Sequence, residues 1–179
     1  MEELERLGIK LDFVRQVPNT LTAQAFITTD LDDNQITAFH PGAMNHSHLN
    51  KITGELDAGL AIVAPDGREG MLQHARELAG LGIPFMFDPG QGLPMFSGEE
   101  LLAFVEQASY VAVNDYEGRM LEERTGRKLE EMAQELKALV LTRGSEGSII
   151  YADGQRFLAD ISEKRMELGI EDEQLIRVR

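Results

Sequence analysis

The sequence contains no cysteine and has few basic residues, and both shortages narrow its chemistry. Without cysteine, the 179-residue chain can form no disulfide, thiolate nucleophile or cysteine-based zinc site. It carries 17 lysines and arginines against 31 acids, which gives a formal net charge of -14. Because an acidic surface repels nucleic acids and anionic membranes, we expect neither as the main partner. A local group of donors could still bind a phosphate.

Long apolar runs are also absent. No stretch approaches the roughly 20 residues of a membrane-spanning helix. The charged start MEELERLGIK lacks the apolar core of a signal peptide, so we expect a cytoplasmic protein. A hydrophobic fraction of 42% and a length of 179 residues suit one domain with a real core, or one domain and a small appendage.

The first forty residues are rich in β-prone segments. Residues 1–7 predict the end of a helix that Gly8 stops, and residues 11–17 predict a short strand. Residues 22–29 and 35–40 are separated by a polar turn, so they predict a hairpin. A two-turn helix has little to pack against, which suggests that the chain enters in the middle of a larger fold.

From about residue 60 the sequence alternates between apolar runs and helical patterns. The runs are residues 60–64, 83–87, 110–113, 138–141 and 148–151. The predicted helices are residues 68–79, 99–108, 117–124 and 129–137. Unbroken apolar strands that alternate with helices predict a parallel sheet covered on both faces. The last two strands are joined by a short link alone, so we expect them to be antiparallel.

Small, polar or acidic residues follow four of these predicted strands. In an open α/β sheet, ligands bind outside the carboxyl ends of the strands. Polar side chains are costly to bury without partners, so this shared edge is a candidate site. The alternative is that loops of α/β proteins are polar and glycine-rich in any case. The four segments are Pro65-Asp66-Gly67, Asp88-Pro89-Gly90-Gln91-Gly92, Asn114-Asp115-Tyr116-Glu117 and residues 142–147.

Asn114 and Glu117 open a predicted helix and allow two interpretations. An amide and a carboxylate three residues apart lie on one helical face and can order a hydrated Mg²⁺ beside a phosphate. The same two residues suit an ordinary helix, with Asn114 as the N-cap and Glu117 as the first-turn acid. Spacing alone favours the ordinary helix.

Residues 142–147 form a glycine-bounded segment rich in donors. Thr142, Arg143 and the backbone N–H groups could hold a polyphosphate, or the segment could simply be a hairpin turn. It is no P-loop, because GxxxxGK[ST] occurs nowhere in the chain. His46 and His48 lie in a predicted loop over residues 45–50, and without an evident third ligand we do not expect them to bind a metal.

These segments, in this order, resemble the PfkB carbohydrate kinase family, which includes ribokinases and adenosine kinases. The resemblance covers residues 1–157. Leu7-Gly8-Ile9 followed by Thr22-Ala23-Gln24-Ala25 is similar to the entry to the family's lid strands, and Phe39-His40-Pro41-Gly42-Ala43 looks like the lid's exit. Asn114-Asp115-Tyr116-Glu117 matches the N-x-x-E motif, and residues 140–147 resemble the nucleotide-side strand and turn. The sequence around Phe87–Gly92 looks most like that of bacterial adenosine-kinase-like sugar kinases.

The resemblance implies a fold, a reaction and a set of site residues. The fold would be α/β and ribokinase-like, a mostly parallel sheet flanked by helices with a small β lid. The reaction would transfer the γ-phosphate of ATP, with Mg²⁺, to a hydroxyl of a sugar or nucleoside. Asn114 and Glu117 would organise Mg²⁺. The ATP phosphates would lie along Thr142, Arg143, Gly144 and Gly147, and the acceptor would contact Gln24, Phe26, Asp88 and Gln91.

Two parts of the family pattern are missing, so we expect a partial fold that is truncated at both ends. No paired-glycine acceptor motif precedes the lid, and no G-x-G-D motif with its catalytic aspartate follows residue 157. We divide the chain into a helix end and lid at 1–43, an α/β core at 44–157 and an atypical tail at 158–179 of the kind that a frameshift produces. No catalytic residue is assigned, and we expect little or no turnover.

Two other interpretations stay open. The chain could be a non-catalytic α/β binding or dimerisation module, a homodimer joined through the open edges of its lid strands. It could also be an unrelated α/β domain, such as a regulator with acidic strand ends. Residues 114–117 together with residues 142–147 distinguish a kinase from such a regulator, because a regulator that is phosphorylated on aspartate needs no glycine turn at the latter place.

Overall fold

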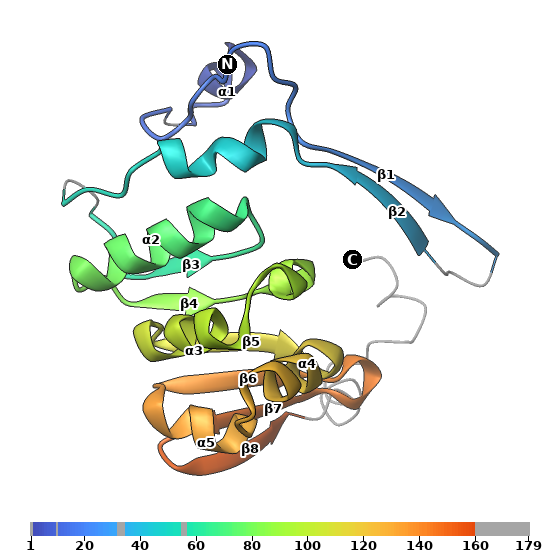
Figure 1. Cartoon of the computed structure of the whole chain (residues 1–179), viewed down its shortest axis with the longest axis vertical. Coiled ribbons are helices and arrows are strands. Elements are labelled where there is room, and N and C mark those ends of the chain that lie inside the picture. Colours follow the sequence, from blue (N-terminus) through green and yellow to red (C-terminus); the bar gives the residue numbers. More distant parts are fainter. Residues whose placement is uncertain (1, 10, 32–34, 55–56, 160–179) are drawn as a thin grey trace.

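The computed structural model describes residues 2–9, 11–31, 35–54 and 57–159, which form a hairpin and a six-stranded sheet with helices packed on it (Figure 1). Helix α1 (Glu2–Arg6) precedes the hairpin, which consists of β1 (Gln24–Thr29) and β2 (Gln35–His40). The 3-10 helix η1 (Gly42–Leu49) connects the hairpin to the sheet. The predicted hairpin is therefore confirmed, and Gly8, with φ at +71°, ends the first helix as expected.

The strands of the large sheet lie side by side in the order in which they occur in the chain. The first four are parallel and the last two turn back antiparallel. They are β3 (Ala61–Val63), β4 (Phe85–Phe87), β5 (Tyr110–Asn114), β6 (Ala138–Thr142), β7 (Ser148–Ala152) and β8 (Gln155–Ala159). The predicted parallel sheet with a terminal antiparallel pair is confirmed, and β8 is a strand that the sequence pattern did not predict.

Helices occupy the connections between these strands. They are α2 (Arg68–Gly80), η2 (Gly90–Met95), α3 (Gly98–Gln107), α4 (Asp115–Thr125), α5 (Leu129–Met132), η3 (Ala133–Glu135) and η4 (Gly144–Glu146). A capping box begins α3: the Glu100 N–H donates to Ser97 Oγ (3.2 Å), and Glu100 Oε2 accepts from the Ser97 N–H (2.9 Å). Gly126, with φ at +70°, ends α4 in the left-handed conformation that glycine favours.

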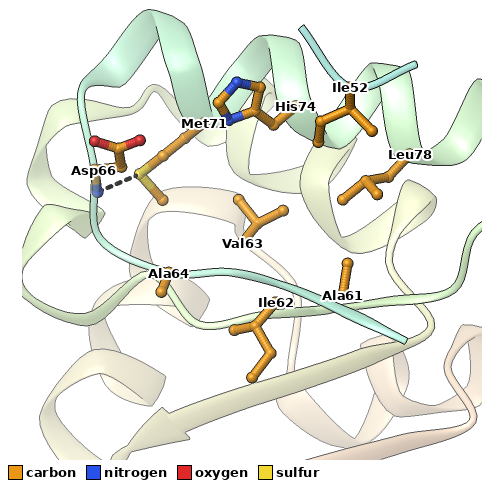
Figure 2. A pocket seen from close by; sticks show the side chains of 9 residues that line it. All are labelled: Ile52, Ala61, Ile62, Val63, Ala64, Asp66, Met71, His74 and Leu78. Atoms are coloured by element: carbon orange, nitrogen blue, oxygen red, sulfur yellow. Dashed lines mark hydrogen bonds between the residues drawn. The ribbon is translucent and has the colours of Figure 1, made fainter. Parts of the chain in front are cut away.

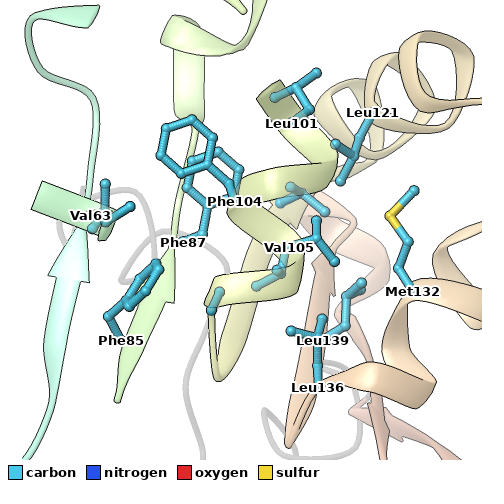
Figure 3. Packing of buried hydrophobic residues seen from close by; sticks show 14 of the residues in the cluster. Val63, Phe85, Phe87, Leu101, Phe104, Val105, Leu121, Met132, Leu136 and Leu139 are labelled. Atoms are coloured by element: carbon cyan, nitrogen blue, oxygen red, sulfur yellow. The ribbon is translucent and has the colours of Figure 1, made fainter. Parts of the chain in front are cut away.

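A single hydrophobic core lies between the sheet and its helices (Figure 3). Alternate strand residues point into it, among them Val63, Phe87 and Leu139. The helices supply the other wall. Phe104 of α3 stacks on Phe87 with ring centroids 4.3 Å apart and meets Phe96 edge-on at 5.0 Å. The side-chain alternation of the strands thus places one face of β3 to β7 against helices, whereas β8 is exposed throughout.

The opposite face of the sheet is largely uncovered by the described residues. Ile62 has 63% of its surface exposed, and the register partners along this face are half-exposed. They include Met86, Ala112, Val140 and Ile150. The expectation that both faces are covered is therefore wrong for this part of the chain, because the α-helices that follow β3, β4 and β5 all contribute to the one core.

Two local expectations are also wrong. Residues 11–17 form a turn and an irregular segment in place of a strand, and their polar groups bond to a side chain: Asn50 Nδ2 donates to the Phe13 carbonyl (2.9 Å), and Arg15 Nε donates to Asn50 Oδ1 (3.0 Å). Residues 45–49, expected as a loop, belong to η1. Of the predicted tail at 158–179, Leu158 and Ala159 end β8 and the rest lies outside the described residues. No helix that the structure describes is long and apolar enough to cross a membrane.

Candidate functional site

The carboxyl ends of β3 to β6 form one edge of the sheet, and the hairpin projects on the same side of the molecule (Figure 1). Asn114 ends β5 and is the direct register partner of Thr142, the last residue of β6. Asp88 follows β4, and its backbone N–H donates to the Val63 carbonyl of β3 (3.0 Å). The structure therefore brings the predicted Asn114 and Thr142 together and places Asp88 further along the same edge.

Asn114 and Glu117 form a complete capping box at the start of α4. The Glu117 N–H donates to Asn114 Oδ1 (2.8 Å), and Glu117 Oε2 accepts from the Asn114 N–H (2.8 Å). The ordinary-helix interpretation is therefore correct as geometry. It does not exclude a second role, because both residues are half-exposed and, within the described chain, the other Glu117 oxygen accepts no hydrogen bond.

The segment after β6 is a tight turn held by its own backbone. The Arg143 N–H donates to the Gly147 carbonyl (2.8 Å), and the Arg143 guanidinium forms an ion pair with Glu146. Gly147 has φ at +84° and ψ at -140°, a conformation essentially restricted to glycine. Thr142 and Gly144 are exposed and Gly147 is buried, so this turn presents the first two to solvent and uses the last for its shape.

A hollow of about 250 Å³ adjoins this edge, between α4, α5 and the strands β6 and β7. Asp115 and Arg143 both line it, together with Arg119 and Tyr151. The Tyr151 hydroxyl donates to Glu130 Oε1 (2.8 Å), and burial, then this hydrogen bond, raises the pKa of Tyr151. Asp115 belongs to the predicted segment 114–117 but was given no role of its own, and Arg119 was not predicted as a site residue. A usable signal existed, because residues four apart share a helix face.

The four predicted acceptor residues fall into two exposed groups. Gln24 and Phe26 lie on the same face of β1 by strand alternation, and Phe26 has 63% of its surface exposed. Asp88 is half-exposed and Gln91 is exposed, both in the segment that follows β4. The structure thus does not enclose them in one cavity, although the hairpin and that segment lie on the same side of the molecule (Figure 1).

A second hollow, of about 130 Å³, lies beside β3 and was not predicted (Figure 2). Its lining is mostly apolar, with Asp66 and His74 as its two ionisable residues. The Asp66 N–H faces Met71 Sδ at 3.3 Å, and His74 Nε2 lies 2.9 Å from the Asn50 carbonyl. Asp66 belongs to the predicted segment 65–67, but the hollow itself carries no sequence signal, because it depends on how residues around 50 fold against α2.

The donor set of the described residues suits a hydrated cation better than a bare one. Among them, no three His, Cys, Asp or Glu side chains gather as a metal site. His46 and His48 have ring centroids 6.3 Å apart. Mg²⁺ commonly keeps several waters and takes only one or two carboxylates from the protein, so the single free Glu117 oxygen and its Asn114 neighbour fit such an ion.

Comparisons of the sequence and of the structure with known proteins point to the same family. Residues 1–165 match the model of the pfkB family carbohydrate kinases. The structure of Burkholderia thailandensis nucleoside kinase in complex with inosine superposes with a TM-score of 0.83 at 50% identity, over 89% of this chain and 52% of that one. Ribokinase from Thermotoga maritima, at 19% identity and a TM-score of 0.60, shares the fold.

A curated relative agrees with these matches. Nucleoside kinase from Methanocaldococcus jannaschii is 30% identical over 154 residues, which are 86% of this chain and 50% of the relative. The chain thus spans about half the length of the nucleoside kinases that it matches. The α/β architecture, the small antiparallel hairpin and these matches confirm the predicted ribokinase-like fold. The chain belongs to the pfkB family of carbohydrate kinases.

Proposed function

We propose that this chain is the nucleotide-binding part of a kinase that transfers the γ-phosphate of ATP to a hydroxyl of a nucleoside. The observation that carries the proposal is the placement of Asn114 beside Thr142 at the carboxyl ends of adjacent strands. A nucleoside acceptor is favoured over a free sugar because a relative at 50% identity was solved with inosine. Another structure of that relative is described as a complex with ADP-inosine, which supports ATP as the donor.

The site residues divide into a phosphate side and an acceptor side. Thr142, Arg143 and Gly144 offer a hydroxyl, a guanidinium and an exposed backbone N–H to the phosphates, while Gly147 shapes the turn. Arg143 would exchange its Glu146 partner for a phosphate oxygen, since guanidinium binds either anion. On the acceptor side, Phe26 would stack on a base and Gln24, Asp88 and Gln91 would bond to sugar or base hydroxyls and amides.

A magnesium ion would bind through the Asn114 and Glu117 pair. When bound, Mg²⁺ would neutralise part of the negative charge of the phosphates. The chain's own contribution is the capping box, which fixes the Glu117 carboxylate relative to the end of β5 and leaves one oxygen to accept hydrogen bonds from waters around the ion. The N-terminus of the 11-residue helix α4 adds N–H groups and a partial positive charge at the same place.

Asn114→Ala tests the nucleotide site, with Ser97→Ala as its matched control. Both residues cap a helix with the same pair of hydrogen bonds, but only Asn114 lies at the proposed site. Each substitution should lower the free energy of unfolding by about 1 kcal/mol through loss of the cap. Only Asn114→Ala should weaken Mg²⁺-dependent ATP binding, by about tenfold or more, which corresponds to one or two lost polar contacts. Isothermal titration calorimetry measures the affinity, and urea unfolding measures the stability.

Equal ATP affinity of the two variants would contradict the proposed role of Asn114. An intact dimer with no nucleotide affinity at all would favour the binding or dimerisation module, whose interface would be the exposed hairpin. That second candidate has an observation behind it: Ile27, Ile36 and Phe39 of the hairpin are each more than half exposed. Because no G-x-G-D aspartate occurs in the sequence, we expect the chain to bind nucleotide without turnover, and Mg²⁺-dependent phosphorylation by the chain alone would contradict that expectation.

A further inference from the structure

Two arginines hold the end of η2, the 3-10 helix that carries Gln91. Arg68 Nε of α2 donates to the Met95 carbonyl (3.2 Å), and Arg124 Nη1 of α4 donates to the Phe96 carbonyl (2.8 Å). The last carbonyl groups of a helix have no donor within it, so side chains can satisfy them. Two different helices thus fasten the end of the segment that follows β4.

Arg68 occupies a position that local preference disfavours. It is the first residue of α2, where the partial positive charge of the helix terminus repels a cation. Each of its three nitrogens nevertheless has an acceptor, because Nη1 donates to Glu69 (2.7 Å), Nη2 donates to Glu100 of α3, and Nε reaches the end of η2. Its guanidinium carbon also lies 6.0 Å from the centre of the Phe96 ring, within reach of a cation–π contact. A residue that breaks a local rule but has every nitrogen bonded indicates a role beyond its own helix.

Gln91 depends on these anchors more than its neighbour Asp88 does. The Asp88 N–H is bonded directly to β3, through the Val63 carbonyl (3.0 Å). Gln91 lies beyond the strand, in the first turn of a six-residue 3-10 helix, and its side chain is exposed. Short 3-10 helices have poor hydrogen-bond geometry, so contacts from outside fix their orientation. The buried Leu93 holds the middle of η2, and Arg68 ties its end to α2 and α3.

We propose that Arg68 is a positioning residue that fixes, through η2, where the Gln91 amide meets the acceptor nucleoside. The inference rests on the proposed function, which takes Gln91 as an acceptor contact. The planar guanidinium bonds to the Met95 carbonyl and to Glu100 at the same time, and it therefore sets the distance between η2 and α3. A lysine ammonium would pair with Glu100 as a point charge but would not reproduce this fork. A binding residue must be held closely by its neighbours, because a small displacement of its side chain costs affinity.

Inosine binding measures the effect of this positioning. Arg68→Met keeps the apolar stem without the donors, and Arg68→Lys keeps the charge without the fork. Both substitutions should weaken the affinity of the 179-residue chain for inosine by about fivefold or more, as expected for one displaced hydrogen bond, and should leave its Mg²⁺-dependent ATP affinity unchanged. Arg127→Met is the matched control, since Arg127 also pairs with a glutamate (Glu135, 2.6 Å), but in η3 and not at η2. Isothermal titration calorimetry measures both affinities.

A double-mutant cycle separates positioning from general structural support. Gln91→Ala alone should weaken inosine binding, and Arg68→Met should then add little, because Arg68 acts through Gln91. Amide hydrogen exchange followed by NMR supplies a readout without ligand. The Gly92 and Phe96 N–H groups form hydrogen bonds along η2 (2.9 and 3.2 Å), and their exchange should accelerate at least about threefold in Arg68→Met but not in Arg127→Met.

Four outcomes would overturn the inference. They are equal inosine affinities of Arg68→Met and Arg127→Met, losses from Arg68→Met and Gln91→Ala that add in full, an unchanged inosine affinity of Gln91→Ala, and no inosine binding by the unaltered chain. Circular dichroism shows whether each variant is folded, and Arg68→Lys decides if Arg68→Met is not. Failure of the proposed ATP site would appear separately, as loss of ATP binding by a chain that still binds inosine.

Discussion

Gly98 reveals how closely the start of α3 approaches the end of α4. A side-chain carbon at residue 98 would collide with the backbone carbonyl of Arg124, which cannot move aside as a flexible side chain can. We therefore expect Gly98→Ala to lower the free energy of unfolding by about 1–3 kcal/mol, the usual cost of overpacking. Urea unfolding followed by circular dichroism measures this loss.

Gly80 provides the comparison for that substitution. It is also a helical glycine, the last residue of α2, but a side-chain carbon there would have no atom within 4 Å. Gly80→Ala should be neutral or should stabilise by up to about 1 kcal/mol, because alanine lowers the entropy of the unfolded chain and favours helix. Similar losses for Gly98→Ala and Gly80→Ala would show that the contact with Arg124 has no energetic weight.

Individual site residues were visible in the sequence, but their neighbours were not. The spacing of Asn114 and Glu117 predicted a helix start, and the structure shows the two residues in the predicted capping geometry. That Thr142 lies opposite Asn114, 28 positions earlier in the chain, depends on the register of β5 and β6, which no local pattern encodes. The ion pair between Arg143 and Glu146 could not be predicted from the sequence either, because it depends on the shape of the turn.

At the scale of elements, the cap of α3 should make stability depend on acid. The Ser97 backbone N–H and, after it, the Arg68 guanidinium hold the pKa of Glu100 below its ordinary value of 4.5. A carboxyl whose pKa is lower in the folded state adds stability above its unfolded pKa, and that stability is lost as the pH falls through the lower, folded value. Melting temperature should therefore drop below pH 4.5.

Glu100→Gln separates this effect from general acid denaturation. Glutamine keeps the capping hydrogen bonds but cannot titrate or pair with Arg68, so the variant should be slightly less stable at pH 7, by less than about 1 kcal/mol for such a solvated pair. The difference from the unaltered chain should shrink toward pH 3. Glu99→Gln removes an exposed carboxylate from the same turn and is the matched control. If the melting temperatures of the unaltered chain, Glu100→Gln and Glu99→Gln fell in parallel as the pH is lowered, the role assigned to Glu100 would be contradicted.

Elements with strong local signals were predicted well, and those that rely on distant partners were not. Caps, glycine stops and apolar runs located α2, α3, α4 and the strands to within a few residues. Residues 11–17 have a strand-like composition, but they form hydrogen bonds with the side chain of Asn50 and not with a partner strand. β8, which composition does not mark, forms because β7 offers it an edge. The uncovered face of the sheet has no local signature at all.

At the scale of the whole molecule, one core couples most of the helices and strands. Phe104 of α3 is 1% exposed and contacts Phe87 of β4 and Phe96 in the following loop, so it joins a helix to a strand and a loop. Phe104→Ala should lower the free energy of unfolding by about 3–5 kcal/mol and keep a single unfolding transition. Phe26→Ala on the hairpin, where 63% of the side chain is exposed, should change it by less than about 0.5 kcal/mol. Two separate transitions in Phe104→Ala would argue against one shared core.

The strand order of the large sheet has a consequence for how the protein is made. Each strand from β4 to β7 pairs only with its predecessor and its successor in the chain. A nascent chain can therefore add strands one at a time as it leaves the ribosome, with no early strand waiting for a late one inside the sheet. β3 is the first strand of this sheet to be made in the described chain, so its side away from β4, on which no described strand pairs, is exposed to a chaperone before the rest of the described sheet exists.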